Sequence, residues 1–171
     1  MNGAIKDALR GIVLFFSKRQ IRRLLYLGIL AAAAVAEFLT AGLVRRTFVF
    51  YAVRDETPIV EDRMLVRGSS KEVDITRYVE ELLLGPASLN AAPLFPRETA
   101  LEALLYRDGV VYADLSRYAA LPPPEGGDVF RSLASIDQGI RRNFPFVRDI
   151  RLFIDGNEVA FRGFLPKIED T

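Results

Sequence analysis

The longest hydrophobic run of the chain covers residues 24–44, in which Glu37 is the only charged side chain. As a helix, this run spans about 31 Å at roughly 1.5 Å per residue, close to the ~30 Å hydrocarbon core of a bilayer. Six Lys and Arg residues precede the run, and Arg45, Arg46 and Arg54 are the nearest ones after it. By the positive-inside rule we expect a single-pass transmembrane helix in the inner (cytoplasmic) membrane. Residues 1–23 are then a basic cytoplasmic segment, and the C-terminal domain is extracytoplasmic, in the periplasm.

Two features of this run leave alternatives open. Ala34 and Ala36 have the small-x-small form of a cleavage site, although the long basic segment before the run favours an uncleaved anchor over a signal peptide. Glu37 costs a few kcal/mol inside a membrane, so it marks a helix–helix contact or, as we favour, lies near the interface. Residues 5–16 fit either a basic interfacial helix or a loosely ordered tail.

Shorter periodic patterns follow and predict a folded domain over residues 47–162, with 163–171 as a short tail. Strand-like runs predict six strands, at 47–53, 64–67, 100–106, 110–115, 149–154 and 158–161. Apolar stripes at helical spacing predict two helices, one over 74–84 and one from Asp128 to just before Pro145. Asp74 and Asp128 are the expected N-caps of these helices.

Turn residues separate these elements. Gly85-Pro86 ends the first helix, because glycine accepts a left-handed cap and proline cannot continue a helix. Asp108-Gly109 and Asp155-Gly156-Asn157 predict two tight hairpin turns. The order ββαββαββ predicts an α+β fold in which two helices pack on one mainly antiparallel sheet.

The net charge of +1 hides an asymmetry. Residues 1–46 hold eight basic and two acidic side chains, whereas the remainder holds 15 basic and 20 acidic ones, which indicates two environments for one chain. The chain has no Cys and no His, which excludes disulfides, thiolate or imidazole metal sites, and Ser–His or Cys–His catalysis. Adjacent acidic residues point apart on a helix or strand, so their adjacency is no evidence for a glycosidase pair. We predict no catalytic residue, metal site, cofactor or small-molecule substrate, and no nucleic-acid binding by an exported acidic domain.

A series of short motifs runs through the predicted domain. They are Glu81-Leu82-Leu83-Leu84-Gly85-Pro86, residues 94–99 (LFPRET), residues 108–116 (DGVVYADLS), residues 144–147 and residues 150–156 (IRLFIDG). In order and spacing they resemble the GerMN domain family of the sporulation and spore-germination protein GerM and of LpqB-type lipoproteins. The matching positions, which we interpret as structural, are Leu83, Gly85, Pro86, Pro96, Asp108, Gly109, Asp155 and Gly156.

The resemblance implies an extracytoplasmic, non-catalytic module whose fold is similar to the ring-building motifs of secretion and sporulation machines. It therefore implies self-assembly or docking onto a cell-envelope complex. The germination role is not carried over, because this chain has one such domain and no Cys for lipid attachment. It also has Arg141-Arg142 where the family often has a Thr-Leu pair.

The basic residues Arg141, Arg142, Arg148 and Arg151 form the local cationic cluster of the predicted domain. They are candidates for contact with lipid headgroups, acidic wall polymer or another copy, although a solvated helix end is the favoured interpretation. Our leading hypothesis is a membrane-anchored protein-interaction or self-assembly module, whose partners are the bilayer and an envelope protein or a further copy. The alternatives are a cell-wall glycan-binding module and, more weakly, a carboxylate-dependent wall hydrolase. An open sheet edge or apolar patch would favour assembly, and exposed aromatic rings in a groove would favour glycan.

Overall fold

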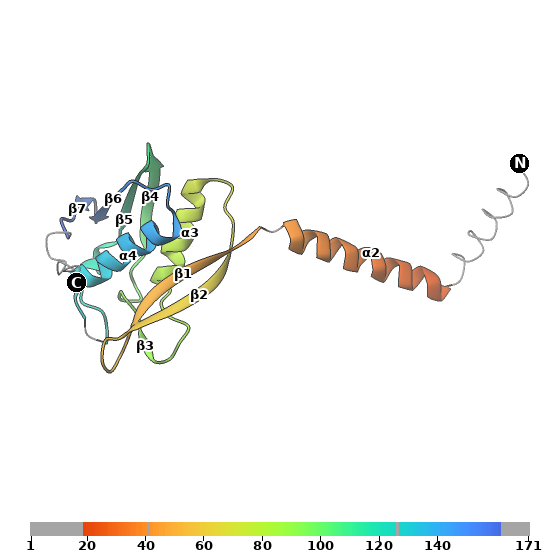
Figure 1. The fold of residues 1–171 in the computed structure, drawn as a ribbon, viewed down its shortest axis with the longest axis horizontal. Helices are drawn as coiled ribbons and strands as arrows, with labels where there is room; N and C mark the ends of the chain where they lie inside the picture. The colour runs from red at the N-terminus through yellow and green to blue at the C-terminus, as the bar shows by residue number, and fades with distance from the viewer. Residues whose placement is uncertain (1–18, 41, 126, 162–171) are drawn as a thin grey trace, which may run out of the picture. The chain divides into compact units, whose positions relative to one another are not determined.

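The computed structural model describes residues 19–40, 42–125 and 127–161 (Figure 1). The chain divides into two compact units, Met1–Gly42 and Leu43–Thr171, which are described separately. The predicted N-terminal interfacial segment up to residue 18 and the predicted tail at 163–171 lie outside the described residues.

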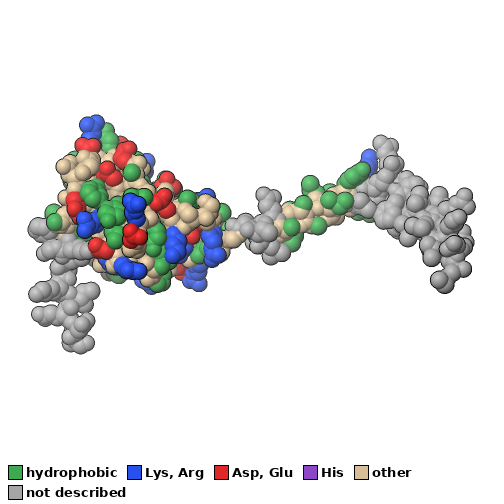
Figure 2. Space-filling view, turned by 90° about the horizontal axis from the view of Figure 1, so that it is seen from above, with side chains coloured by type: hydrophobic (Ala, Val, Ile, Leu, Met, Phe, Trp, Pro, Cys, Tyr) green, Lys and Arg blue, Asp and Glu red, His purple; other side chains and the backbone are tan. Residues whose placement is uncertain are grey.

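The first unit contains one described helix, α2 (Arg19–Thr40). The large hydrophobic side chains that are described on this helix, from Leu24 to Val35, are exposed, as the space-filling view shows along the helix (Figure 2). Within the described residues, no helix combines the length and the apolar character needed to cross a membrane. The predicted transmembrane helix at residues 24–44, and the single-pass inner-membrane location that depended on it, were therefore wrong. The hydrophobic run is divided between two elements, because α2 begins in the basic segment and ends at Thr40, whereas Leu43 already belongs to a strand. The side chain of Glu37 is not among those described.

The second unit begins with a three-stranded antiparallel sheet. Its strands are β1 (Leu43–Ala52), β2 (Pro58–Val66) and β3 (Ala91–Ala92), in the order β2-β1-β3. Both strands of the hairpin are longer than predicted. The sequence indicated a polar loop up to residue 62, but Ile59, Glu61, Arg63 and Leu65 alternate with exposed residues along β2. Two of the inward-facing positions are charged, which hides the period of two that identifies a strand.

A second sheet has four strands, which corrects the prediction of one sheet. They are β4 (Leu101–Arg107), β5 (Val110–Leu115), β6 (Asp149–Ile154) and β7 (Asn157–Glu158), in the order β4-β5-β6-β7. Strands β5 and β6 are parallel, because the chain between them crosses over through the short helix η1 (Arg117–Ala120) and a longer helix. At the β4–β5 turn, Asp108 and Gly109 both have positive φ, at 51° and 84°.

Two helices complete the α+β unit, α3 (Lys71–Leu83) and α4 (Val129–Asn143). Asp128 caps α4 as predicted, but Ser70, not Asp74, caps α3. Helix α3 contacts α4 and β4, and α4 contacts β1, so the helices join the two sheets (Figure 1).

The core is centred on the fully buried ring of Tyr78, which stacks on Phe48 and meets Phe144 edge-on, with ring centroids 4.7 Å and 5.7 Å away. A Cβ atom on Gly139 would lie 2.1 Å from the Tyr78 hydroxyl oxygen. Glycine at this position therefore lets α4 approach the ring closely. Glycine lowers the intrinsic stability of the helix at this position, and the close packing on Tyr78 offsets that loss.

Candidate functional site

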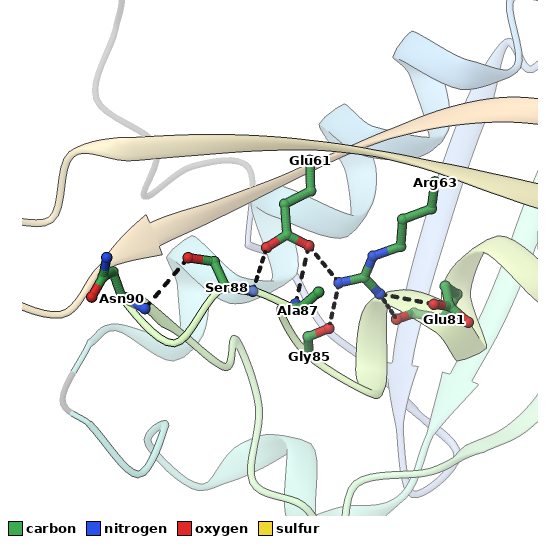
Figure 3. Close-up of polar contacts among 7 residues, drawn as sticks. All are labelled: Glu61, Arg63, Glu81, Gly85, Ala87, Ser88 and Asn90. Carbon is green, nitrogen blue, oxygen red and sulfur yellow. Dashed lines mark hydrogen bonds and ion pairs between the residues drawn. The ribbon is translucent and has the colours of Figure 1, made fainter.

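A buried cluster of charge connects β2 to the end of α3 (Figure 3). The guanidinium of Arg63 donates to Glu61 Oε2 at 2.6 Å, to Glu81 Oε1 at 2.8 Å and to the Gly85 carbonyl oxygen at 2.8 Å. Its side chain is 16% exposed and lies over the rings of Phe48 and Phe50. Arg63 therefore holds two acidic side chains and the end of a helix at one point of the sheet.

Glu61 extends this cluster into the loop after α3. Its carboxylate accepts hydrogen bonds from the backbone N–H groups of Ala87, at 3.1 Å, and Ser88, at 2.9 Å (Figure 3). Burial alone would raise the pKa of the Glu61 carboxyl, but the hydrogen bonds from Arg63, Ala87 and Ser88 outweigh burial and lower the pKa. The loop at residues 85–90 is thus fixed to β2 by charge-assisted hydrogen bonds. We call Glu61, Arg63 and Glu81 the charge clamp.

The clamped loop forms one side of a surface groove that encloses ≈ 1530 Å³, including the solvent at its mouth. Leu83 and Leu84 at the end of α3 line it, together with Leu89 of the loop and Leu101 of β4. Leu84 is 81% exposed and Leu89 is 99% exposed. Two neighbouring leucines in water on the rim of a groove constitute an exposed apolar surface. We call this feature the leucine groove.

The outer edge of β2 is the second notable surface. Strand β2 has nine residues and pairs with β1 alone, so it is the edge strand of its sheet. Alternate residues of an antiparallel strand direct their peptide groups away from the partner. The hydrogen bond from the Ala52 N–H to the Thr57 carbonyl sets this alternation, which turns the peptide groups of Val60, Asp62 and Met64 outward. The side chains of Val60 and Met64 are also more than half exposed.

Side chains cover part of the free edges of β1 and β4. The free edge of β1 is closed at Thr47, whose N–H donates to Asn143 Oδ1 at 2.9 Å and whose carbonyl accepts from Asn143 Nδ2 at 2.8 Å. In β4, the N–H of Tyr106 donates to Glu72 Oε2 at 2.9 Å, and an irregular register at the start of the strand interrupts the edge. The edge of β2 from Val60 to Met64 has no such cover among the described residues.

In the structure, Arg141 contacts Arg148 of the predicted cluster by donating to its carbonyl oxygen at 3.1 Å, whereas Arg142 and Arg151 have other neighbours. Arg141 pairs with Asp137 at 2.9 Å and Asp149 at 3.5 Å. Arg151 lies 3.9 Å from Glu158. Arg148 packs its stem beside the turn at Gly109, and the charge of Arg142 lowers the pKa of Asp62, after the larger effects of hydrogen bonds from Arg45 and Thr47. The charges of Arg141 and Arg151 are therefore paired with acidic side chains of the same chain.

Seven of the eight predicted motif positions fall into two groups, and the carbonyl oxygen of the eighth, Pro96, accepts from the Thr99 N–H at 3.0 Å. Leu83 and Pro86 line the leucine groove, and Gly85, with φ of +90°, receives Arg63 at its carbonyl. The Asp-Gly pairs at 108–109 and 155–156 both form turns with positive φ. Sequence reasoning missed Glu61 and Arg63 as members of a site. The signal available was the alternation of Ile59, Glu61, Arg63 and Leu65, which places the two charges on the inner face of a strand. The described residues contain no cluster of three or more acidic side chains placed to hold a metal.

A family model described as Germane, sporulation and spore germination, matches residues 48–160. The tandem GerMN domains of the sporulation protein GerM from Bacillus subtilis are 19% identical, with a TM-score of 0.51 over 69% of this chain and 41% of that one. The chain thus spans less than half of that tandem structure. The first GerMN domain of the same protein is 20% identical, with a TM-score of 0.49 over 68% of this chain and 86% of that one.

A candidate lipoprotein from Clostridium perfringens is 21% identical, with a TM-score of 0.45 over 70% of this chain and 80% of that one. Among curated proteins, none matches the sequence.

Proposed function

Because this chain belongs to the Germane family of sporulation and spore-germination domains, we propose that it is a non-catalytic protein-interaction module. The resemblance to the GerMN domain that the motifs indicated is confirmed by the match over residues 48–160. The observation that carries the proposal is the open edge of β2. A partner strand can add to such an edge through main-chain hydrogen bonds.

The side chains beside this edge support a protein partner. Val60, Met64 and Val66 are 55%, 58% and 50% exposed and lie on one face of β2. A strand that pairs with β2 would bury part of this apolar surface as well as the outward peptide groups. A second copy of the chain carries the same edge, so it is the first partner to test.

The glycan-binding alternative has less support. Stacking on sugar rings requires an exposed aromatic face. In the leucine groove, the aromatic lining residue among those described is Phe95, which is only 2% exposed. The groove offers leucine and proline side chains instead, which suit a peptide better than a sugar.

Sedimentation velocity of the full chain over a range of concentrations tests the proposal. We expect the average mass to rise with concentration. In the double variant Val60→Lys/Met64→Lys, the concentration at which association begins should be at least about tenfold higher, because lysine on an edge strand opposes pairing. Leu105→Lys is the matched control, because Leu105 is 50% exposed on β4, and it should leave association unchanged.

Two results would contradict the proposal. If the chain stays monomeric at all concentrations but sediments with purified peptidoglycan, the proposal of an interaction module is wrong and the glycan-binding alternative takes its place. Equal effects of the β2 double variant and of Leu105→Lys would remove β2 as the interacting edge.

A further inference from the structure

The described lining of the leucine groove includes no residue of β2, and the groove has features of a preformed binding site. One side is fixed by the charge clamp and by Gly85, whose φ of +90° turns the chain sharply after α3. The other side is fixed where the Ala100 N–H donates to Ser116 Oγ at 3.0 Å, and the Ser116 N–H donates to the Ala100 carbonyl at 2.9 Å. An occupant would therefore meet a surface that needs little ordering, which favours affinity.

An unpaired hydroxyl lies in the lining of this groove. Thr99 is 7% exposed, and its Oγ1 atom is buried without a hydrogen-bond partner among the described residues. Its own N–H is already bonded to the Pro96 carbonyl. A buried hydroxyl without a partner costs on the order of 1–3 kcal/mol, so a ligand that supplies an amide or carbonyl here gains from pairing with it. Extended peptide backbone carries both groups.

The charge of the groove is negative. Glu80 and Glu125 line it, and Arg97 is the cationic lining residue among those described. The groove is thus electrostatically matched to a cationic ligand.

From these observations we propose that the leucine groove binds an extended peptide segment of a partner protein, in which apolar side chains alternate with Lys or Arg. The apolar side chains pack on Leu84 and Leu89, and a basic side chain faces Glu80 and Glu125. The peptide backbone pairs with the Thr99 hydroxyl. The proposal rests on the interaction-module function for the class of ligand, but it does not depend on the edge of β2.

Two synthetic peptides of about ten residues, one of alternating Leu and Lys and one of alternating Leu and Glu, probe the groove. Each is titrated into isotope-labelled full chain, and binding is followed by amide chemical shifts. We expect the Leu–Lys peptide to shift the amides of Leu84, Leu89 and Thr99, and the Leu–Glu peptide to bind at least about tenfold more weakly. Equal affinities, or shifts confined to other surfaces, would overturn the proposal.

Three variants make the test specific. Glu80→Lys should weaken the Leu–Lys peptide about tenfold and strengthen the Leu–Glu peptide, whereas Glu98→Lys, at an exposed residue outside the lining, should change neither. Thr99→Val should weaken binding while raising the unfolding midpoint, because it removes the unpaired hydroxyl. Unchanged affinity in Glu80→Lys refutes the charge match, and unchanged affinity in Thr99→Val refutes the backbone contact.

The two interaction surfaces remain distinguishable. Val60→Lys/Met64→Lys should leave the affinity for the Leu–Lys peptide unchanged, since neither residue lines the groove. Loss of peptide binding in that variant would show that the peptide occupies the strand edge and not the groove.

Discussion

Replacing Arg63 by Met tests whether the charge clamp holds the groove in place. The side chains of Arg63, Glu61 and Glu81 are 16%, 13% and 30% exposed, so their attraction is only weakly screened. Methionine fills a similar volume but leaves the Glu61 carboxylate buried with only the two loop amides as donors. Removing one partner of a buried ion pair typically costs 3–5 kcal/mol. Because Glu81 remains partly solvated, we expect a loss of about 3 kcal/mol in the free energy of unfolding.

Arg45→Met is the matched control on the neighbouring strand. Arg45 pairs with Asp62, but the two side chains are 72% and 33% exposed, so water screens the pair. Because exposed pairs contribute little to stability, we expect Arg45→Met to lose much less stability than Arg63→Met. The two variants remove the same kind of charge from the same hairpin and differ mainly in burial.

Urea unfolding, followed by circular dichroism, measures both losses, and hydrogen exchange reports on the loop. In Arg63→Met, the amides of Ala87 and Ser88 should exchange faster than in Arg45→Met, because their acceptor Glu61 is no longer held by the guanidinium. The reasoning is refuted if the two variants lose equal stability within about 0.5 kcal/mol, or if the loop amides keep their protection in Arg63→Met.

Three further predictions concern the core, the clamp and the β1 edge. Gly139→Ala should lower the free energy of unfolding by about 1–3 kcal/mol despite its better helix propensity, because the alanine Cβ would lie 2.1 Å from the Tyr78 hydroxyl oxygen. In a double-mutant cycle, adding Tyr78→Phe should recover part of that loss. The folded-state pKa of Glu61 lies below its ordinary value of 4.5, so the stability that the ionised carboxylate contributes is complete above pH 4.5 and is lost as the pH falls below it. The difference in unfolding free energy between wild type and Glu61→Gln, measured by urea unfolding, should therefore narrow from pH 7 to pH 3. Asn143→Ala should cost about 1–3 kcal/mol and speed amide exchange at Thr47, because it uncovers the edge of β1. Protection at Thr47 equal to wild type would contradict the last of these.

Features set by a few adjacent residues could be predicted from the sequence. The Asp108-Gly109 turn, the Asp128 cap and the Gly85-Pro86 helix end all occur where expected. Each depends on local backbone chemistry, because a left-handed turn needs a residue that tolerates positive φ and an N-cap needs a short polar side chain. The buried stripe of α3, which includes Tyr78 and Leu82, followed from helical spacing in the same way.

Features that depend on distant partners could not be predicted in this way. The start of β1 at Leu43 is set by pairing with Val66, 23 positions away, and so a hydrophobic run that fits a membrane helix in length is divided between a helix and a strand. The sequence predicts a strand only at 64–67 and a polar loop for the first part of β2. The inner face of β2 carries Glu61 and Arg63, whose burial is tolerable only with Glu81 and the loop amides nearby.

The sequence by itself determined the family, the α+β class, the two Asp-Gly turns and the Asp128 cap, because these depend on short motifs and on period. Only the tertiary structure decided that the unit has two sheets, that Arg141 and Arg151 pair with different acidic side chains, and that β2 keeps an open edge. It also brought Glu80, Leu89 and Thr99 to one groove. These are facts of long-range packing, in which a residue's role depends on the side chain that the fold places against it.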